Sequence, residues 1–197
     1  MKKNLICTTA LILAAILTLT AVSAFAEDPE PFQIRDGISF GMSADDVIAQ
    51  EIKNGTTETA DEWEAAEFGG WHAIQAGNKS SYCGFDMYIM YMFANDQLVF
   101  AVYDSYSMED DEAAFDSIAS KLIEDFGEPA VLTPADIVGY MDHFVPGMYQ
   151  EDSLQDGNIW ETDSVTVRQF YYGSKTFVVM FSDPDFDYSS VEPASAE

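Results

Sequence analysis

The chain has 197 residues, of which 35 are acidic and 8 are Lys or Arg, and its formal net charge is −27. This length allows one or two domains, and the acidic excess argues against nucleic-acid binding, which needs Lys and Arg to neutralise phosphates. Since 48% of the residues are hydrophobic and 14% aromatic, the chain is too apolar to be a disordered acidic tail.

Residues 1–26 have the pattern of a secretory signal peptide. Lys2 and Lys3 precede an apolar run that ends in Ala24-Phe25-Ala26, a small-x-small cleavage site. We expect cleavage after Ala26 and a protein that is secreted or resides in the cell envelope. The alternative is an uncleaved membrane anchor, because the apolar run is just long enough to span a bilayer. Cleavage removes two lysines and no acid, so no membrane binding is expected afterwards.

The exported chain should begin with an acidic lead-in and a first strand, residues 27–37. Ser43 followed by Asp46 forms a capping-box pattern, which predicts a helix over 44–52. Residues 56–70 are acidic and mixed in character, and we expect a short helix there.

The strongest β signal lies in the middle of the chain. A strand is expected at 71–75, followed by a hairpin in which 82–93 pairs with 98–103 around an Asn-Asp turn. Cys83 opens this apolar run and is the only cysteine after cleavage. Burial as a small hydrophobic residue is its expected role, and an intermolecular disulfide is the alternative.

The second half repeats this order of helices and then strands. Apolar residues at helical spacing predict a helix over 107–126, and Thr133-Pro134 predicts the start of a shorter helix to about 144. Three strands should follow, at 158–161, 165–172 and 176–182. From Asp183 to the end, residues 183–197, we expect a disordered acidic tail.

Strands that follow one another, rather than alternating with helices, favour the α+β class. The predicted fold is a single domain over residues 38–182. It has a mainly antiparallel sheet of about five to six strands, with two main helices packed on one face.

Two short segments carry a family resemblance. Phe40-Gly41-Met42-Ser43, opening the first helix, and Phe126-Gly127-Glu128-Pro129, ending a later one, resemble segments of SmpA/OmlA-type envelope lipoproteins and of secreted β-lactamase inhibitory proteins. They are also similar to many uncharacterised exported bacterial proteins. The resemblance implies a helix-backed antiparallel sheet used for protein–protein contact, with no catalytic residues. The lipid-attachment cysteine of the first group and the paired cysteines of the second are absent from this sequence.

Motifs for catalysis, metals and cofactors are lacking. His72 and His143 are the only histidines and show no zinc-ligand spacing, and no nucleotide-binding or nucleophile motif occurs. We therefore predict no catalytic residue, metal or cofactor. Two alternatives stay open: weak extracellular calcium binding, suggested by the alternating acids of Asp183–Asp187, and hydrolysis by a carboxylate pair.

The strands carry the remaining functional signal, because both of their alternating residue sets are apolar. If the helices cover one face, the second face is partly open and rich in Tyr and Met, a composition typical of adaptable binding surfaces. The alternative is that residues 56–70 or the helix at 133–144 cover it. The predicted function is a non-enzymatic binding module for a protein partner with a basic or apolar patch. Its candidate contacts are Tyr88, Met90, Met92, Tyr103 and Tyr172.

Overall fold

A computed structural model describes residues 31–106, 111–147, 149–172 and 176–192. The predicted signal peptide and its cleavage site lie outside these residues. No helix in the described part of the chain has the length and apolar character needed to cross a membrane.

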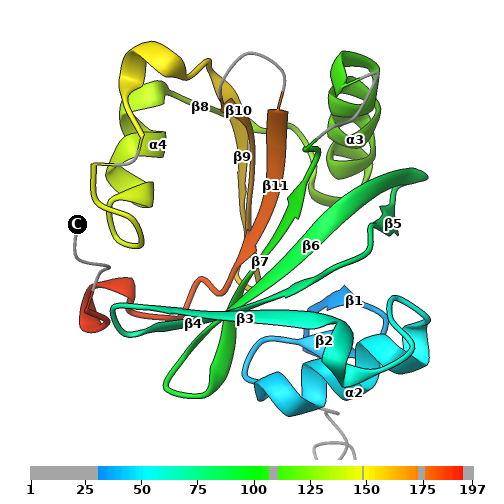
Figure 1. Cartoon of the computed structure of the whole chain (residues 1–197). Coiled ribbons are helices and arrows are strands. Elements are labelled where there is room, and N and C mark those ends of the chain that lie inside the picture. The colour runs from blue at the N-terminus through cyan, green and yellow to red at the C-terminus, as the bar shows by residue number, and fades with distance from the viewer. Residues whose placement is uncertain (1–30, 107–110, 148, 173–175, 193–197) are drawn as a thin grey trace, which may run out of the picture. The chain divides into compact units, whose positions relative to one another are not determined.

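The core of the molecule is a nine-stranded antiparallel sheet (Figure 1). Its strand order is β3-β4-β6-β7-β11-β10-β9-β8, and β5 pairs with β6 beyond the end of β4. The strands are β3 (Trp63–Phe68), β4 (Trp71–Ala76), β5 (Ser80–Tyr82), β6 (Phe85–Ala94), β7 (Gln97–Asp104), β8 (Ala130–Leu132), β9 (Gly157–Glu161), β10 (Thr166–Tyr172) and β11 (Thr176–Ser182). A separate two-stranded sheet joins β1 (Gln33–Arg35) to β2 (Ile38–Ser39).

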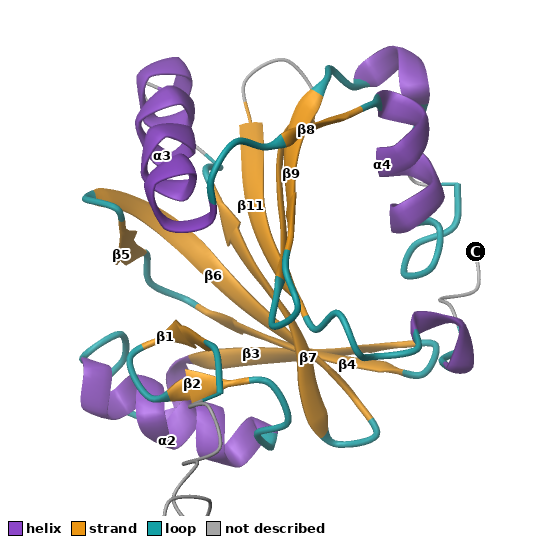
Figure 2. Ribbon diagram, turned by 180° about the vertical axis from the view of Figure 1, so that it is seen from behind, coloured by secondary structure: helices purple, strands orange, loops and turns teal. Residues whose placement is uncertain are grey.

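The predicted fold is wrong in its strand number and in its helix arrangement. The described residues form nine plus two strands and three α-helices, α2 (Ala44–Asn54), α3 (Asp111–Phe126) and α4 (Pro134–Met141). Figure 2 shows α3 and α4 on opposite sides of the strands β9 and β11. The prediction of two helices on one face fails because α4 covers the other face.

The hairpin of β6 and β7 contains an irregularity that decides which side chains share a face. Asn95 and Asp96 have positive φ angles of 52° and 61°, as a tight two-residue turn requires. Pairing runs from Phe93 with Leu98 directly to Met92 with Phe100. One extra residue, Val99, is therefore accommodated in β7 as a bulge, and the register beyond it shifts by one.

The first face of the sheet carries a core covered by α2, α3 and the small β1–β2 sheet (Figure 2). Ser43 caps α2 by accepting a hydrogen bond from the Asp46 backbone N–H at 3.3 Å, which confirms the predicted start of this helix. Val47 of α2 and Ile118 of α3 are fully buried against the strands. Burial of such side chains stabilises the fold by about 1.5–3 kcal/mol each.

A charged group also lies inside this first core. Glu51, on α2, has no solvent exposure, and its carboxylate lies 3.2 Å from the Arg35 guanidinium. The hydroxyls of Tyr91 and Thr56 donate further hydrogen bonds to Glu51. Burial alone would lower the pKa of the Arg35 guanidinium, but the Glu51 carboxylate, together with Tyr103 and Tyr91, raises that pKa overall. The charge is therefore paired and hydrogen-bonded, as buried charges in proteins must be.

The second face carries another core, covered by α4, the segment after it and the C-terminal segment. The Trp71 ring packs 4.8 Å from Phe144 and 6.3 Å from both Phe186 and Tyr188. Residues 183–192 are therefore held against the sheet, in contrast to the disordered tail predicted from Asp183. Residues 193–197 of that prediction lie outside the described part of the chain.

Cys83 is exposed, so its predicted burial is wrong. The expected continuous strand over residues 82–93 is interrupted by a turn at Cys83-Gly84, where both residues have positive φ angles. This turn places Tyr82 in β5 and starts β6 at Phe85. The thiol thus lies at a loop tip rather than in the core.

Candidate functional site

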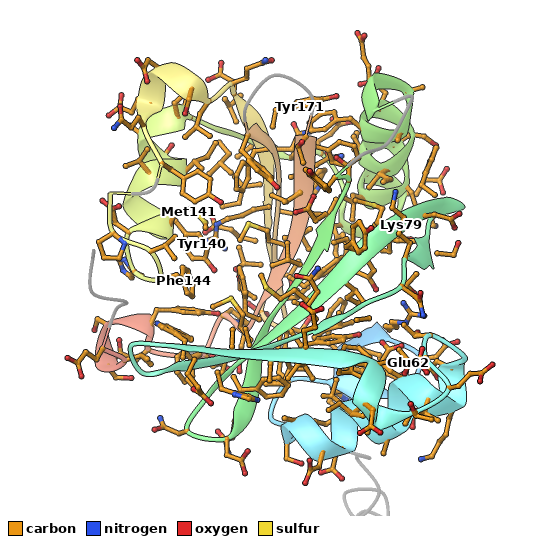
Figure 3. The ribbon with its side chains drawn as sticks, viewed as in Figure 1. Glu62, Lys79, Tyr140, Met141, Phe144 and Tyr171 are labelled. Carbon is orange, nitrogen blue, oxygen red and sulfur yellow. The ribbon has the colours of Figure 1, made fainter. Side chains whose placement is uncertain are left out.

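An apolar cavity of about 180 Å³ lies between α4 and the second face of the sheet, and we refer to it as the α4 cavity. Met141 and Phe144 extend from the α4 side toward the strands (Figure 3). The described lining residues come from four adjacent strands and from the α4 region. They are Met90, Met92, Phe100, Val102, Asp104, Phe170, Tyr172, Val178, Met180, Met141, Phe144, Val145 and Tyr149.

Strand alternation brings these side chains together. Met90 and Met92 of β6 lie opposite Val102 and Phe100 of β7 in the strand register. Residues two apart on a strand point to the same face, so β7 contributes three side chains to the cavity wall and each of the other three strands contributes two. Methionine side chains are flexible and polarisable, and a wall rich in them adapts to ligands of different shape.

Asp104 is the sole charged residue among the described residues that line the cavity. The Tyr172 hydroxyl donates to its Oδ2 at 2.9 Å, and the Tyr106 backbone N–H donates to its Oδ1 at 2.7 Å. Burial raises the pKa of the Asp104 carboxyl, and these two hydrogen bonds act in the opposite direction. The carboxylate therefore marks the polar end of an otherwise apolar space.

A second hollow of about 330 Å³ adjoins this polar end, and we refer to it as the outer hollow. It shares Met90, Val102 and Asp104 with the α4 cavity. Its other described lining residues are Glu64, Gln75, Ala76, Gly77, Tyr88 and Tyr106. Asp104 therefore lies where the two spaces meet.

The structure brings together four of the five predicted contact residues. Met90, Met92 and Tyr172 line the α4 cavity, and Tyr88 lines the outer hollow. Tyr103 does not join them, because it is buried in the core on the first face. Without the bulge at Val99 the hairpin would pair Tyr88 with Tyr103; with it, Tyr88 pairs with Asp104.

The second face is less open than predicted. Of the two expectations for this face, an open surface or cover by the helix at 133–144, the second describes the structure better. α4 and the segment after it pack against the second face. Among the described residues the exposed large apolar side chains are Tyr106 and Val131. The remaining space is a cavity rather than a flat apolar patch.

Asp104 and the α4 side of the cavity are not among the residues predicted from the sequence. Asp104 follows the predicted strand at 98–103, so a count of two residues from Val102 would have placed it on that strand's face. Met141 and Phe144 were available as apolar positions of the predicted helix. Nothing in the sequence indicated that they would face Met90 and Met92.

The acids of the suggested calcium segment have local partners. Asp183 accepts a hydrogen bond from the Asp185 backbone N–H at 2.9 Å, and Asp187 accepts one from the Ser189 backbone N–H at 3.1 Å. Within the described residues, no three potential ligand side chains gather closely enough to hold a metal ion. The calcium and hydrolase alternatives stay predictions.

No protein-family model matches the chain, and searches of curated proteins and of solved structures find no match to it. The resemblance to envelope lipoproteins and β-lactamase inhibitory proteins therefore stays a prediction. The site must be interpreted from its own geometry and chemistry.

Proposed function

We propose that the protein is a non-enzymatic binding module of the cell envelope or extracellular space that takes an apolar group of its partner into the α4 cavity. The observation that carries this proposal is an apolar space of about 180 Å³ bordered by an open hollow. An apolar cavity of about 150 Å³ is large enough to bind benzene. A single ring or short alkyl chain therefore fits the α4 cavity.

The composition of the wall supports binding rather than catalysis. Methionine and aromatic side chains dominate the described lining, which contains no Ser, Thr, Cys, Lys or His. Ligand sites of this kind are concave and mostly apolar, with a few polar groups that orient the ligand. Asp104 and Tyr172 supply those polar groups here.

The test uses 2-phenylethanol as an uncharged aromatic probe and ¹³C-methyl methionine NMR of the purified protein. Four described methionines line the cavity, namely Met90, Met92, Met141 and Met180. Two others, Met42 and Met87, belong to the first core. We expect saturable shifts of the four cavity methyl groups, while the two first-core methyl groups stay in place.

A matched pair of variants localises the binding. Val102→Phe places a ring in the cavity and should weaken probe binding by about tenfold or more, since overpacking removes the space a ligand needs. Val131→Phe makes the same change at a position with 68% exposure and should bind like the wild type. Should Val102→Phe not fold, Val145→Phe tests the same wall from the loop after α4. Absence of shifts in the wild type, or unchanged binding in a folded cavity variant, would overturn the proposal.

A further inference from the structure

The carboxylate of Asp104 lacks a cationic partner in the described part of the chain. The four ion pairs found there involve other carboxylates, on Glu51, Glu67, Glu124 and Asp125. The nearby Lys79 ammonium lies 5.3 Å from the centre of the Tyr88 ring. Asp104 is thus a half-buried carboxylate at the edge of an apolar space, and its partners are neutral. A cationic ligand could supply the counter-charge that the described residues do not supply.

Asp104 also has free capacity to accept hydrogen bonds. An ionised carboxylate offers about four acceptor positions, and the described structure uses two of them, for the Tyr172 hydroxyl and the Tyr106 backbone N–H. Those two donors hold the carboxylate in place without neutralising it. A primary ammonium could fill the remaining positions through charge-assisted hydrogen bonds, which are stronger than neutral ones.

We infer that the ligand of this site is an apolar ammonium, with its aryl or alkyl group in the α4 cavity and its ammonium group on Asp104. The inference rests on the proposed function, because it assumes that the cavity receives an apolar group. The formal charge of −27 favours the approach of a cation over that of an anion. Glu64 adds a second carboxylate to the lining of the outer hollow.

The experiment compares 2-phenylethylammonium with 2-phenylethanol, which has nearly the same shape and no charge, using the methionine shifts described above. In the wild type the ammonium should bind at least about tenfold more tightly than the alcohol, because hydrogen bonds to charged groups exceed neutral ones by about this factor. Asp104→Asn should remove that advantage, so that the two probes bind this variant with affinities within about twofold of each other.

Two controls separate local pairing from the overall field of an acidic protein. Asp86→Asn removes one charge from an exposed position on β6 and should keep the full ammonium preference. Ethylammonium, which has the charge without the ring, should not shift the cavity methionines. A peptide with N-terminal phenylalanine carries the same ammonium and ring, and comparing its affinity with that of the free amine distinguishes a protein N-terminus from a small molecule as the source.

The pH dependence gives an independent readout. Burial raises the pKa of Asp104, so its carboxylate takes up a proton at a higher pH than exposed aspartates do. The ammonium preference should therefore disappear as the pH falls through that raised pKa, while alcohol binding stays constant. Among the described residues, the titratable or charged groups that line the two spaces with Asp104 are Tyr88, Tyr106, Tyr149, Tyr172 and Glu64, and Lys79 lies over the Tyr88 ring.

The outcomes distinguish the two proposals. Equal binding of alcohol and ammonium, or an ammonium preference that survives Asp104→Asn, would overturn the inference and leave the proposed function standing. A loss of preference in Asp86→Asn equal to that in Asp104→Asn would also overturn it, because the effect would then be diffuse. Absence of methionine shifts with the alcohol would instead contradict the proposed function itself.

Discussion

The carboxylates of Glu51 and Asp104 differ in whether the described residues supply a cationic partner. Glu51 is fully buried and is matched by Arg35 and by two hydroxyl donors. Asp104 is half-buried and has only neutral partners among the described residues. The first arrangement satisfies a charge within the fold, and the second leaves a charge available at a cavity. This contrast is why we assign structure to Glu51 and recognition to Asp104.

The Glu51 cluster should be essential for stability. Glu51→Gln keeps the shape of the side chain but leaves the Arg35 guanidinium without its counter-ion inside the protein. Breaking a buried ion pair costs about 3–5 kcal/mol, so the free energy of unfolding in urea should fall by about that amount. Glu124→Gln removes one of the two carboxylate partners of Lys121 at a position with 72% exposure and should change the unfolding midpoint little. Equal midpoints for the two variants would contradict this role.

The sheet face of each contact residue was predicted correctly where simple strand alternation decides it, and wrongly beyond the bulge in β7. Tyr88, Met90 and Met92 are spaced by two along one strand, and the structure places them along the second face. Tyr103 was grouped with them, but the extra residue at Val99 turns it to the first face. A one-residue slip exchanges the faces of a strand, and a bulge inside a hairpin leaves no clear mark in the sequence.

At the scale of elements, α4 is the part that creates the site. Its start is fixed by a capping box in which the Thr133 hydroxyl accepts from the Asp136 backbone N–H at 3.3 Å, and the Asp136 carboxylate accepts from the Thr133 backbone N–H at 3.2 Å. The Arg168 guanidinium stacks 3.7 Å from the centre of the Tyr140 ring and donates to Ser182 at 2.9 Å. These contacts fasten a helix of only eight residues to the sheet.

Removing the α4 cap should loosen this element selectively. Thr133→Ala should lower the local stability of α4 by about 1 kcal/mol, seen as faster hydrogen exchange of its amides. Hydrogen bonds from Thr133 lower the pKa of Asp136 in the folded protein. In the wild type, the contribution of this cap to stability is therefore fully present above the ordinary aspartate pKa. It is lost as the pH falls through the lowered pKa of Asp136. Ser43→Ala, the equivalent change at α2, should speed exchange in α2 and leave α4 unaffected. Uniform acceleration in both variants would argue against local capping.

The elements with strong local signals were predicted, and those defined by their partners were not. The helices at α2 and α4 follow from their caps, and the Asn95-Asp96 turn follows from its residues. The sequence predicts a short helix within residues 56–70, but the structure forms the strand β3 there. Residues 64–67 are exposed in this strand and show no apolar alternation that would have indicated it. Its strand conformation comes from pairing with β4 at the sheet edge, which depends on sequence-distant positions rather than on local preference.

For the whole molecule, the charge of −27 acts as a long-range repulsion within the folded state. The edge strand β3 exposes Glu64 and Glu67, and charged side chains on an edge discourage pairing with another chain. These charges discourage pairing of β3 with another chain, but their mutual repulsion also destabilises the compact folded state. Stability should therefore depend on the ionic strength.

Raising NaCl from about 0.01 M to about 1 M shortens the screening length from about 30 Å to about 3 Å and should raise the urea midpoint of unfolding. Calcium chloride and magnesium chloride at equal ionic strength distinguish screening from a specific ion site. Equal effects of the two salts indicate screening, whereas a larger effect of calcium would support the calcium-binding alternative. A midpoint that stays constant with NaCl would contradict the repulsion argument.

The position of β11 has a consequence for the order of folding. This last strand lies in the middle of the sheet, between β7 and β10, and Phe177 at its start bonds to Ser105, 72 residues earlier in the chain. Contacts between distant residues form slowly because a long loop must close first. The N-terminal strands cannot complete the sheet until nearly the whole chain is available. The sheet is therefore completed only at the end of synthesis, and a late completion of this kind would suit the export that residues 1–26 predict.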